Sequence, residues 1–202
     1  LGEKVKLGDK VAVIGGGNVA MDAVRTAVRT GSKEVFILYR RTRAEMPASP
    51  EEIEEAIEEG IEMKFLVAPK RVVGKDGKVT GVECTRMELG EPDASGRRRP
   101  VEIKGSEFIV ECDAIVPAIG QEADLSFITS ESGVSINKWN NVDFDKVTFE
   151  TNVPGIFTGG DVSTGPQTVV KAVYSGKEAA KSIDRYLQGL DMKAGREKDW
   201  MK

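Results

Sequence analysis

The amino-acid sequence predicts an α/β fold, in which a Rossmann-like arrangement of parallel strands carries an inserted antiparallel sheet and is followed by a smaller C-terminal segment. Three observations predict it. Within about forty residues of the N-terminus, an apolar strand, a glycine-rich turn, an amphipathic helix and a second apolar strand succeed one another. Between Lys70 and about Val110 the pattern changes to hairpins. Beyond Gln121, polar turns and short strands lead into one last amphipathic helix.

The first strand–helix–strand unit has the composition of a buried parallel core. Residues 11–14 are continuously apolar, as expected for a strand that is covered on both faces. A helix with an apolar stripe follows, and Gly31 ends it as a C-terminal cap. The stripe consists of Val19, Ala20, Ala23, Val24, Ala27 and Val28. Residues 35–39 form the second strand.

A second helix is predicted from Ser49 to Gly60. Ser49 suits the N-cap, Pro50 the first helical position and Glu52 the third. The many glutamates of this helix indicate a solvated surface, with a docking face for a partner protein as the alternative. Residues 63–67 form the third strand.

The antiparallel insertion precedes the last strand of the parallel sheet. Turns are expected at residues 75–78 and around residues 90–100, where glycine, aspartate and proline gather. The apolar run at residues 114–119 then forms the last core strand, which ends at Gly120.

After this strand the sequence changes from apolar strand residues to polar turns, and we expect a domain boundary at about residue 125. The first domain covers residues 1–125 and the second covers residues 126–202. The second domain contains the last helix, which begins near Gln167 and is followed by a polar tail.

Composition excludes several kinds of site. The net charge of −4 and the pI near 5.2 argue against a nucleic-acid partner, which calls for a basic patch. The arginines at residues 97–99 are interpreted as part of a solvated loop. The chain has no histidine, which excludes a Ser-His-Asp arrangement and removes the commonest metal ligand. We therefore predict no catalytic side chain and no metal site.

The sequence also predicts the cellular compartment and the relation of the chain to a longer protein. Cys84 and Cys112 form no Cys-x-x-Cys pair, so buried reduced thiols in a cytoplasmic protein are expected. No apolar run approaches the ~20 residues that a membrane span needs. The chain begins at Leu1 without an initiator methionine, and a segment cut from a longer protein is the simplest interpretation.

A dinucleotide fingerprint, G-x-G-x-x-A, lies between the first strand and the first helix. Gly15 permits the tight turn, Gly17 lets the backbone approach a pyrophosphate, and Ala20 allows helix and strand to pack closely. The pyrophosphate would lie over the free N–H groups of the helix N-terminus. The alternative is a glycine turn without a ligand. The candidate residues are Gly15, Gly16, Gly17, Asn18, Val19 and Ala20.

The end of the second strand selects between nicotinamide nucleotides. An NAD site usually places a carboxylate there for the ribose hydroxyls, whereas this sequence has Arg40 and Arg41. A guanidinium binds the 2′-phosphate of NADP with paired hydrogen bonds. We therefore predict NADPH as the nucleotide, with a surface arginine run as the alternative.

Several further motifs occur in a fixed order over residues 11–187. They are Gly15–Asp22, Tyr39–Arg41, Glu45–Ala48, Glu58–Ile61, Gly90–Asp93, Ala118–Gln121 and Gly159–Asp161. In this order they resemble the small (beta) subunit of NADPH-dependent glutamate synthase. The chain is equally similar to the NADH-dependent ferredoxin–NADP oxidoreductases and to the corresponding region of dihydropyrimidine dehydrogenase.

The resemblance implies that the second domain is the C-terminal return segment of an FAD-binding domain. Gly160 and Asp161 would then meet the ribityl and pyrophosphate part of FAD. Backbone N–H groups at the start of the last helix would approach the flavin ring and stabilise negative charge on it. These residues are Gln167, Thr168 and Val169. Ile119 and Gly120 would border the nicotinamide nucleotide.

The sequence also departs from the family pattern. No second G-x-G-x-x-G exists for the FAD pyrophosphate, and the cysteines that bind iron–sulfur clusters in the full proteins are absent. We expect the chain to bind NADPH, and to bind FAD only as part of the intact protein.

The function implied is hydride transfer from NADPH to FAD, with onward electron transfer to iron–sulfur centres outside this chain. Partners would be the rest of the FAD domain and an iron–sulfur acceptor or the large glutamate synthase subunit. Two alternatives stay open. One is a ferredoxin-linked or electron-bifurcating NAD(P)H oxidoreductase subunit, and the other is a non-catalytic nucleotide-binding module.

Overall fold

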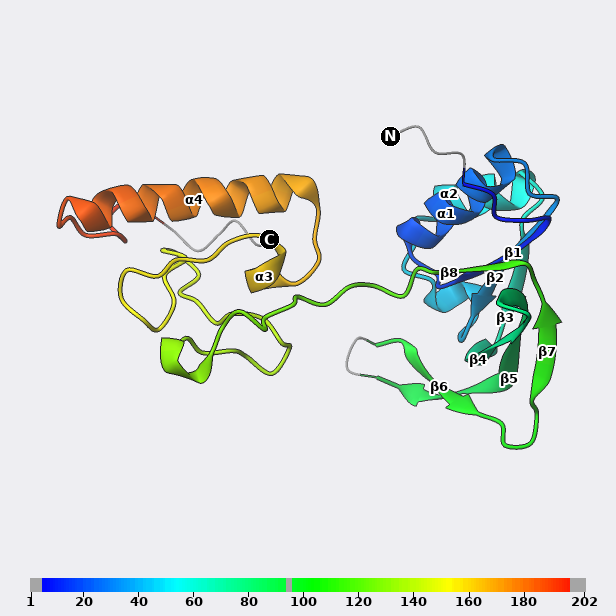
Figure 1. Ribbon diagram of the computed structural model, residues 1–202. Helices are drawn as coiled ribbons and strands as arrows, with labels where there is room; N and C mark the ends of the chain where they lie inside the picture. Colours follow the sequence, from blue (N-terminus) through cyan, green and yellow to red (C-terminus); the bar gives the residue numbers. More distant parts are fainter. Residues whose placement is uncertain (1–4, 94–95, 197–202) are drawn as a thin grey trace. The chain divides into compact units, whose positions relative to one another are not determined.

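The computed structural model describes residues 5–93 and 96–196 of the chain. They form two compact units, and the division falls between Ile119 and Gly120, ahead of the boundary predicted at about residue 125. Each unit has its own secondary structure (Figure 1). No helix within the described residues is long and apolar enough to cross a membrane.

A four-stranded parallel sheet organises the first unit. Its strands lie in the order β3-β2-β1-β8, and every neighbouring pair is parallel. The bounds are β1 Lys10–Ile14, β2 Glu34–Tyr39, β3 Glu62–Phe65 and β8 Ala114–Pro117. Asp113, directly before β8, accepts hydrogen bonds from the N–H groups of Asp9 and Lys10, at 2.8 Å each. This contact fixes the start of β8 beside the start of β1.

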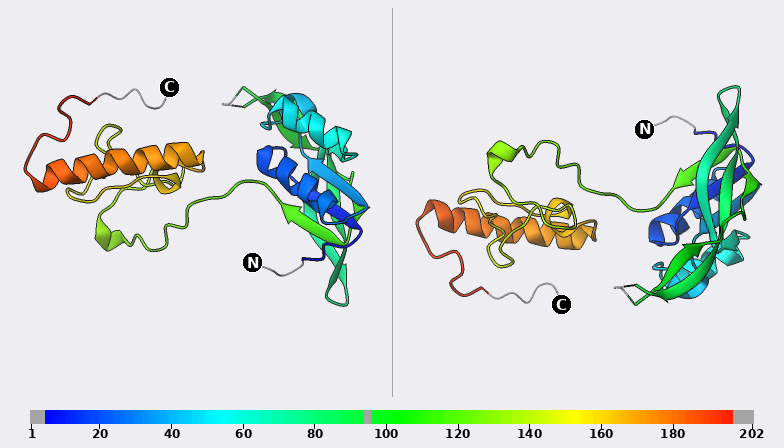
Figure 2. Two further views of the ribbon diagram at one scale, coloured as in Figure 1. Left: turned by 90° about the horizontal axis from the view of Figure 1, so that it is seen from above. Right: turned by 90° about the horizontal axis from the view of Figure 1, so that it is seen from below.

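Two helices cover one face of the parallel sheet (Figure 2). They are α1 (Asn18–Arg29) and α2 (Pro50–Glu58), and a short 3₁₀ turn, η1 (Arg43–Glu45), precedes α2. The hydroxyl of Ser49 caps α2 by accepting from the N–H of Glu52, as the sequence predicts. The core beneath the helices includes Val11, Val13, Met21, Val24, Val35, Ile37, Ile53 and Ala56.

The antiparallel insertion covers the opposite face. Its strands are β4 (Val67–Lys75), β5 (Lys78–Pro92), β6 (Arg98–Glu102) and β7 (Phe108–Glu111), and β5 pairs with all three others. Side chains that alternate with those of the first core face this sheet. They include Ala12, Phe36 and Leu38, packed with Val67, Val82, Cys84 and Cys112. Burial on both faces explains the continuously apolar sequence of β1 and β2.

Some predicted bounds are wrong. The third strand does not reach residue 67, because Leu66 has a φ of 57° and the chain turns there into β4. The last core strand ends at Pro117 instead of residue 119. The hairpin turn predicted around residues 90–100 is narrower, since β5 continues to Pro92 and β6 begins at Arg98. The turn at residues 75–78 is confirmed, with Asp76 and Gly77 both at positive φ.

The second unit consists of turns, two short helical segments and one long helix. These are η2 (Ser130–Ser132), α3 (Asp161–Thr164) and α4 (Val169–Leu187). Where the sequence predicts short strands, the described residues form only the isolated bridges Ile136–Val142 and Glu150–Phe157. The helix α4 packs on the loops of its unit through small side chains, Ser175, Ala179 and Ser182.

The apolar stripe of α4 faces outward. The exposed side chains include Val169, Val170, Val173, Ile183 and Leu187, and Val169, Val170 and Leu187 are each more than three-quarters exposed. An amphipathic helix usually packs such a stripe against a core. The unit therefore presents an apolar helix face, which is the reverse of an ordinary surface helix.

Candidate functional site

The glycine-rich turn after β1 lies at the carboxyl edge of the parallel sheet. Gly15 has a φ of 142°, and a Cβ there would stand 2.2 Å from the carbonyl oxygen of Ala118. A Cβ on Gly16 would stand 2.6 Å from Cε2 of Tyr39. Both glycines are therefore required by the fold itself, because neighbouring strands press against the turn.

Gly17 differs from its two neighbours. Its φ of −94° suits any residue, and among the described residues a Cβ would meet only Cγ of Pro47, at 3.8 Å. The fold therefore gives no steric reason for glycine at this position. Close approach of a ligand to the backbone would supply one.

Four successive backbone N–H groups, from Gly16 to Val19, donate to no acceptor within the part of the chain that the structure describes. They stand at the positive end of the twelve-residue helix α1, which has no acidic side chain in its first turn. The arrangement suits an anion such as a pyrophosphate.

The position of this turn in the sheet favours ligand binding. From β1 the chain builds β2 and β3 on one side and later returns to place β8 on the other side. In open α/β sheets, ligands bind outside the carboxyl ends of the strands at such a point of reversal.

A supporting loop braces the turn from the side of α2. The N–H of Ala48 donates to the carbonyl of Gly16 at 3.1 Å, and the N–H of Ser49 donates to Oδ1 of Asn18 at 2.9 Å. The hydroxyl of Tyr39 donates to the carbonyl of Glu45 at 2.7 Å. These contacts give the motif at residues 45–48 a structural role that the sequence alone did not assign.

Glu45 holds the start of η1. Its carboxylate accepts from the hydroxyl and the N–H of Thr42, at 2.6 and 3.0 Å. The hydrogen bond from the Thr42 hydroxyl is the main cause that lowers the pKa of Glu45, while burial opposes it and the charge of Arg98 assists it. The segment after Arg41 is thus fixed by a charged cap.

The two predicted arginines are placed differently. Arg40 is exposed, whereas Arg41 is buried. Nη2 of Arg41 lies 2.6 Å from Oδ2 of Asp93, and Nε donates to the carbonyl of Arg98 at 2.7 Å. Arg40 is therefore available to a ligand, and Arg41 is engaged inside the protein.

The other predicted residues fall into two groups. Ile119 follows Ala118 beside the glycine turn and is 75% exposed, and Gly120 has a φ of 99°. In the second unit, the N–H of Gly160 donates to Oγ of Ser175 at 2.7 Å. Gly160 has φ 71° and ψ −156°, a conformation open essentially to glycine alone.

The remaining predicted flavin contacts lie close to Gly160. Oδ1 of Asp161 accepts from the N–H of Gln167 at 3.3 Å. The side chain of Thr168 caps α4 by accepting from the N–H of Lys171, and Val169 begins the helix. The structure thus brings all five residues of this set together at the junction of α3 and α4.

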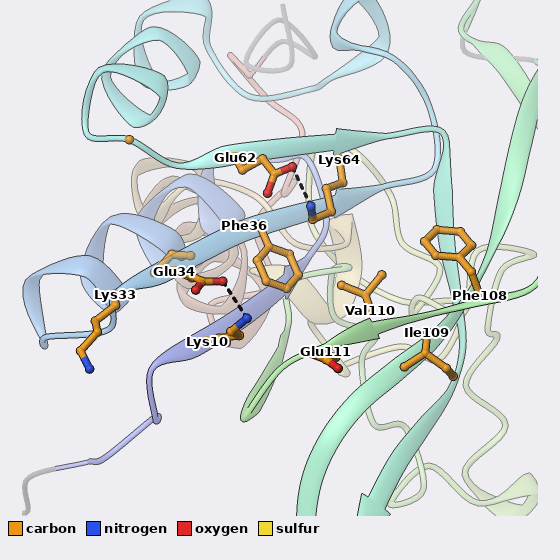
Figure 3. Close-up of a pocket in the computed structure, with 12 residues that line it drawn as sticks. Lys10, Lys33, Glu34, Phe36, Glu62, Lys64, Phe108, Ile109, Val110 and Glu111 are labelled. Atoms are coloured by element: carbon orange, nitrogen blue, oxygen red, sulfur yellow. Dashed lines mark hydrogen bonds and ion pairs between the residues drawn. The ribbon is translucent and has the colours of Figure 1, made fainter.

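Two hollows lie on the first unit. One, of about 680 Å³, borders the supporting loop and is lined largely by apolar side chains, among them Met46, Ile53 and Phe65. The other, of about 500 Å³, lies at the opposite edge of the sheet, where the strands begin (Figure 3). Both lysines of its strands are paired with carboxylates, as Lys10–Glu34 and Lys64–Glu62, so neither is available to the phosphates of a nucleotide.

Comparison with known sequences gives the chain its family. Residues 2–176 match the family described as pyridine nucleotide-disulphide oxidoreductase. The chain belongs to this family. The match covers the glycine turn, both arginines and the start of α4, so the site residues described in this subsection all lie within it.

Curated relatives in this family are longer proteins. The chain is 52% identical to the NADP(+)-dependent formate dehydrogenase subunit beta of Moorella thermoacetica, over 90% of this chain and 25% of that protein. It is 43% identical to the glutamate synthase [NADPH] small chain of Azospirillum brasilense, over 89% of this chain and 37% of that protein. The predicted resemblance to the glutamate synthase small subunit is therefore confirmed. The chain spans less than half the length of either relative.

A solved member of related architecture is thioredoxin reductase of T. acidophilum. It aligns with a TM-score of 0.70 and 25% identity over 89% of this chain and 52% of that one. Together with the observed sheets, this confirms the predicted α/β fold with its antiparallel insertion.

The disulphide chemistry in the family's name finds no support in this member. Cys84 and Cys112 are both buried. Burial, assisted by the nearby Cys112 and Glu83, raises the pKa of the Cys84 thiol to about 11, and burial also raises the pKa of Cys112. Both thiols stay protonated at neutral pH, which makes them poor nucleophiles.

Sequence reasoning missed three residues that shape the site of this family member. Tyr39 supports Gly16, Ala118 presses on Gly15, and Asp93 binds Arg41. Each belongs to a motif that the sequence singles out, but no local pattern assigns it a partner. A large aromatic side chain at the end of a buried strand was the one available signal, for Tyr39.

Proposed function

We propose that this chain is the NADPH-binding portion of a flavoprotein oxidoreductase of the glutamate synthase small-subunit type. One observation carries the proposal. Four N–H groups that find no acceptor among the described residues, from Gly16 to Val19, include that of Gly17, where the fold itself does not require glycine. The exposed Arg40 directly follows the neighbouring strand. An anion-binding backbone site beside an exposed guanidinium suits a dinucleotide with an additional phosphate.

Each part of the nucleotide has a candidate contact. The pyrophosphate would be held by the N–H groups of residues 16–19, and the 2′-phosphate by Arg40. The apolar hollow beside Met46 and Phe65 suits the adenine ring. Ile119 and Gly120 would border the nicotinamide end. When bound, the nicotinamide nucleotide supplies a hydride and the flavin receives it, so the protein's own task is positioning and electrostatics.

We further propose that residues 126–202 are the return segment of an FAD-binding domain. Gly160 and Asp161 would hold the ribityl and pyrophosphate part, and the N–H groups around Thr168 would stabilise negative charge on the ring. The outward apolar stripe of α4 supports this assignment, since such a face is normally covered. FAD binding would then require the longer protein.

The electron acceptor and partner subunit lie outside this chain. The two relatives share this region although their names give different enzymes, a formate dehydrogenase and a glutamate synthase. The shared region therefore fits the shared step, from NADPH to flavin, with onward transfer to iron–sulfur centres. The higher identity to the formate dehydrogenase subunit favours a second candidate, an NADP-linked subunit of another multi-subunit redox complex.

A calorimetric titration tests the proposal. The chain is titrated with NADPH and separately with NADH, and the longer protein is treated in the same way. We expect NADPH to bind more tightly to both. Equal affinities would contradict the role of Arg40, and no binding by either protein would overturn the nucleotide site itself.

A further inference from the structure

The end of the β5–β6 hairpin lies against the end of β2, where the 2′-phosphate is proposed to bind. The hairpin is closed by pairing of Pro92 with Arg98, and the N–H of Asp93 donates to the carbonyl of Arg97 at 2.7 Å. Arg41 reaches both flanks of this turn, since it binds the carboxylate of Asp93 and the carbonyl of Arg98. One buried guanidinium thus joins two segments that are more than fifty residues apart.

A second contact fixes the same place. The N–H of Leu66 donates to the carbonyl of Arg41 at 3.1 Å, and the N–H of Met87 donates to the carbonyl of Leu66 at 2.8 Å. The backbone after β2 is therefore held by the β3–β4 junction and by the hairpin together. Arg40 directly precedes this fixed point.

The hairpin carries a cluster of positive charge to that place. Arg98 is bound to its own hairpin, since its guanidinium donates to the carbonyls of Leu89 and Gly90. Arg41 pairs with the carboxylate of Asp93, and the exposed Arg99 of β6 adds a further guanidinium to this end of the hairpin. A phosphate monoester carries up to two negative charges and is bound best by more than one guanidinium.

We propose that the Arg41–Asp93 ion pair is a clasp that holds the arginine-bearing hairpin beside Arg40, and that this hairpin completes the recognition of the 2′-phosphate. The inference rests on the proposed function of the chain. Asp93 is then a positioning residue, and Arg99 is a specificity determinant. The arginine run that the sequence presents as a solvated loop acquires a role in nucleotide choice.

The test compares two probes that differ only in the phosphate concerned, adenosine 2′,5′-bisphosphate and AMP, by calorimetry on the full chain. In Asp93→Asn we expect the affinity for the bisphosphate to fall about tenfold, comparable to one charge-assisted contact, with the AMP affinity within about twofold of wild type. Asp93→Glu keeps the charge and should restore most of the selectivity. Glu102→Gln, which removes a carboxylate of the same hairpin paired with Lys70, is the matched control.

A second variant tests the inference while keeping the Arg41–Asp93 ion pair, so that a misfolded hairpin does not explain the result. The substitution Arg99→Ala leaves the clasp in place, and thermal melting confirms that the chain is folded. The same selective loss is expected. Unchanged selectivity in this variant, or equal losses for both probes in Asp93→Asn, overturns the inference and leaves the proposed function standing. A wild-type chain that binds both probes equally overturns the inference and the NADPH assignment together.

Discussion

The ring of Tyr39 lies so close beneath Gly16 that a Cβ on this glycine would stand 2.6 Å from Cε2 of the ring. Tyr39 is buried, and its hydroxyl donates to the carbonyl of Glu45. The last residue of β2 therefore shapes the turn that follows β1, and ties it to the loop on the far side.

Tyr39→Phe should destabilise the chain without weakening nucleotide binding. The substitution keeps the ring under Gly16 but leaves the carbonyl of Glu45 without its donor, which costs about 1 kcal/mol or somewhat more. Urea denaturation measures the loss, and NADPH titration measures the affinity. Tyr186→Phe, at an exposed tyrosine, should change neither quantity.

Substitutions at Gly15 and Gly17 should separate folding from binding. Gly15→Ala places a Cβ against the carbonyl of Ala118 at positive φ and should destabilise by at least about 2 kcal/mol. Gly17→Ala should cost no more than about 1 kcal/mol, the effect of a poorer N-cap. It should still weaken NADPH binding by about tenfold or more, because the methyl group would stand between backbone and pyrophosphate.

Melting curves measure the stability of the two variants, and calorimetric titrations measure their affinity for NADPH. Normal NADPH affinity in a folded Gly17→Ala variant would mean that the turn holds no pyrophosphate. A stable Gly15→Ala variant would contradict the close approach of β8 to the turn.

Arg40 and Arg41 should behave differently although they are adjacent. Arg40→Ala should lower the affinity for NADPH by about tenfold and leave the NADH affinity unchanged, since it removes one charge-assisted phosphate contact. Arg41→Ala should also weaken NADPH binding, because it opens the ion pair that holds the hairpin, but unlike Arg40→Ala it should reduce stability by about 2 kcal/mol. This is somewhat below the cost of breaking a fully buried pair, because Asp93 is a quarter exposed. Titration with both nucleotides and urea denaturation distinguish the two patterns.

The contrast between these arginines shows what sequence can predict. The strand–turn–helix unit and its place at the nucleotide could be predicted because apolar periodicity and glycine spacing are local signals. The division of roles within the arginine pair could not, because the partner of Arg41 lies 52 residues away and is set by the register of a hairpin. The end of β3 was likewise missed, since no propensity predicts a positive φ at Leu66.

Asp145 should make the stability of the second unit depend on pH in the acidic range. Burial opposes its ionisation, but hydrogen bonds from Lys193 and from the N–H groups of Thr148 and Val147 lower its pKa to about 2. A carboxylate with a lowered folded pKa stabilises above its unfolded value of ~4, and this contribution is lost as the pH falls from about 4 through about 2.

Asp145→Asn should therefore melt at a lower temperature than wild type at about pH 6, and the difference should shrink towards zero near pH 2. Lys193→Gln, which removes the cationic partner, should show the same trend. A difference that persists unchanged at low pH would show that the charge of Asp145 is not the cause.

A charge in the exposed stripe of α4 should leave the stability of this chain unchanged but should reduce flavin binding by the longer protein. Val173→Asp adds a charge to a half-exposed position, so the melting temperature of the chain should hardly change. In the longer protein the same substitution should reduce flavin content, measured by absorbance, because it places a carboxylate in a covered apolar contact. Lys177→Asp, at an exposed position already charged, is the control.

The helical periodicity of α4 could be predicted from the sequence, but the surroundings of its apolar face could not. Sequence gives the spacing of apolar residues, whereas burial depends on what lies opposite. Among the described residues, small side chains such as Ser175 and Ala179 fill the space against the loops. The relatives are much longer than this chain, and an exposed apolar stripe is consistent with that difference because a longer chain has further residues to cover it.

The pairing of β8 with β1 has a consequence for the order of folding. Asp113 and Asp9 are 104 positions apart, and closing so long a loop costs entropy before any contact repays it. The units β1–α1–β2 and β4–β5 join nearby segments and can form earlier. Ala118 reaches Gly15 only when β8 docks, so the nucleotide turn acquires its final shape in the last step, and a nascent chain would become competent to bind only after β8 and Ala118 have left the ribosome.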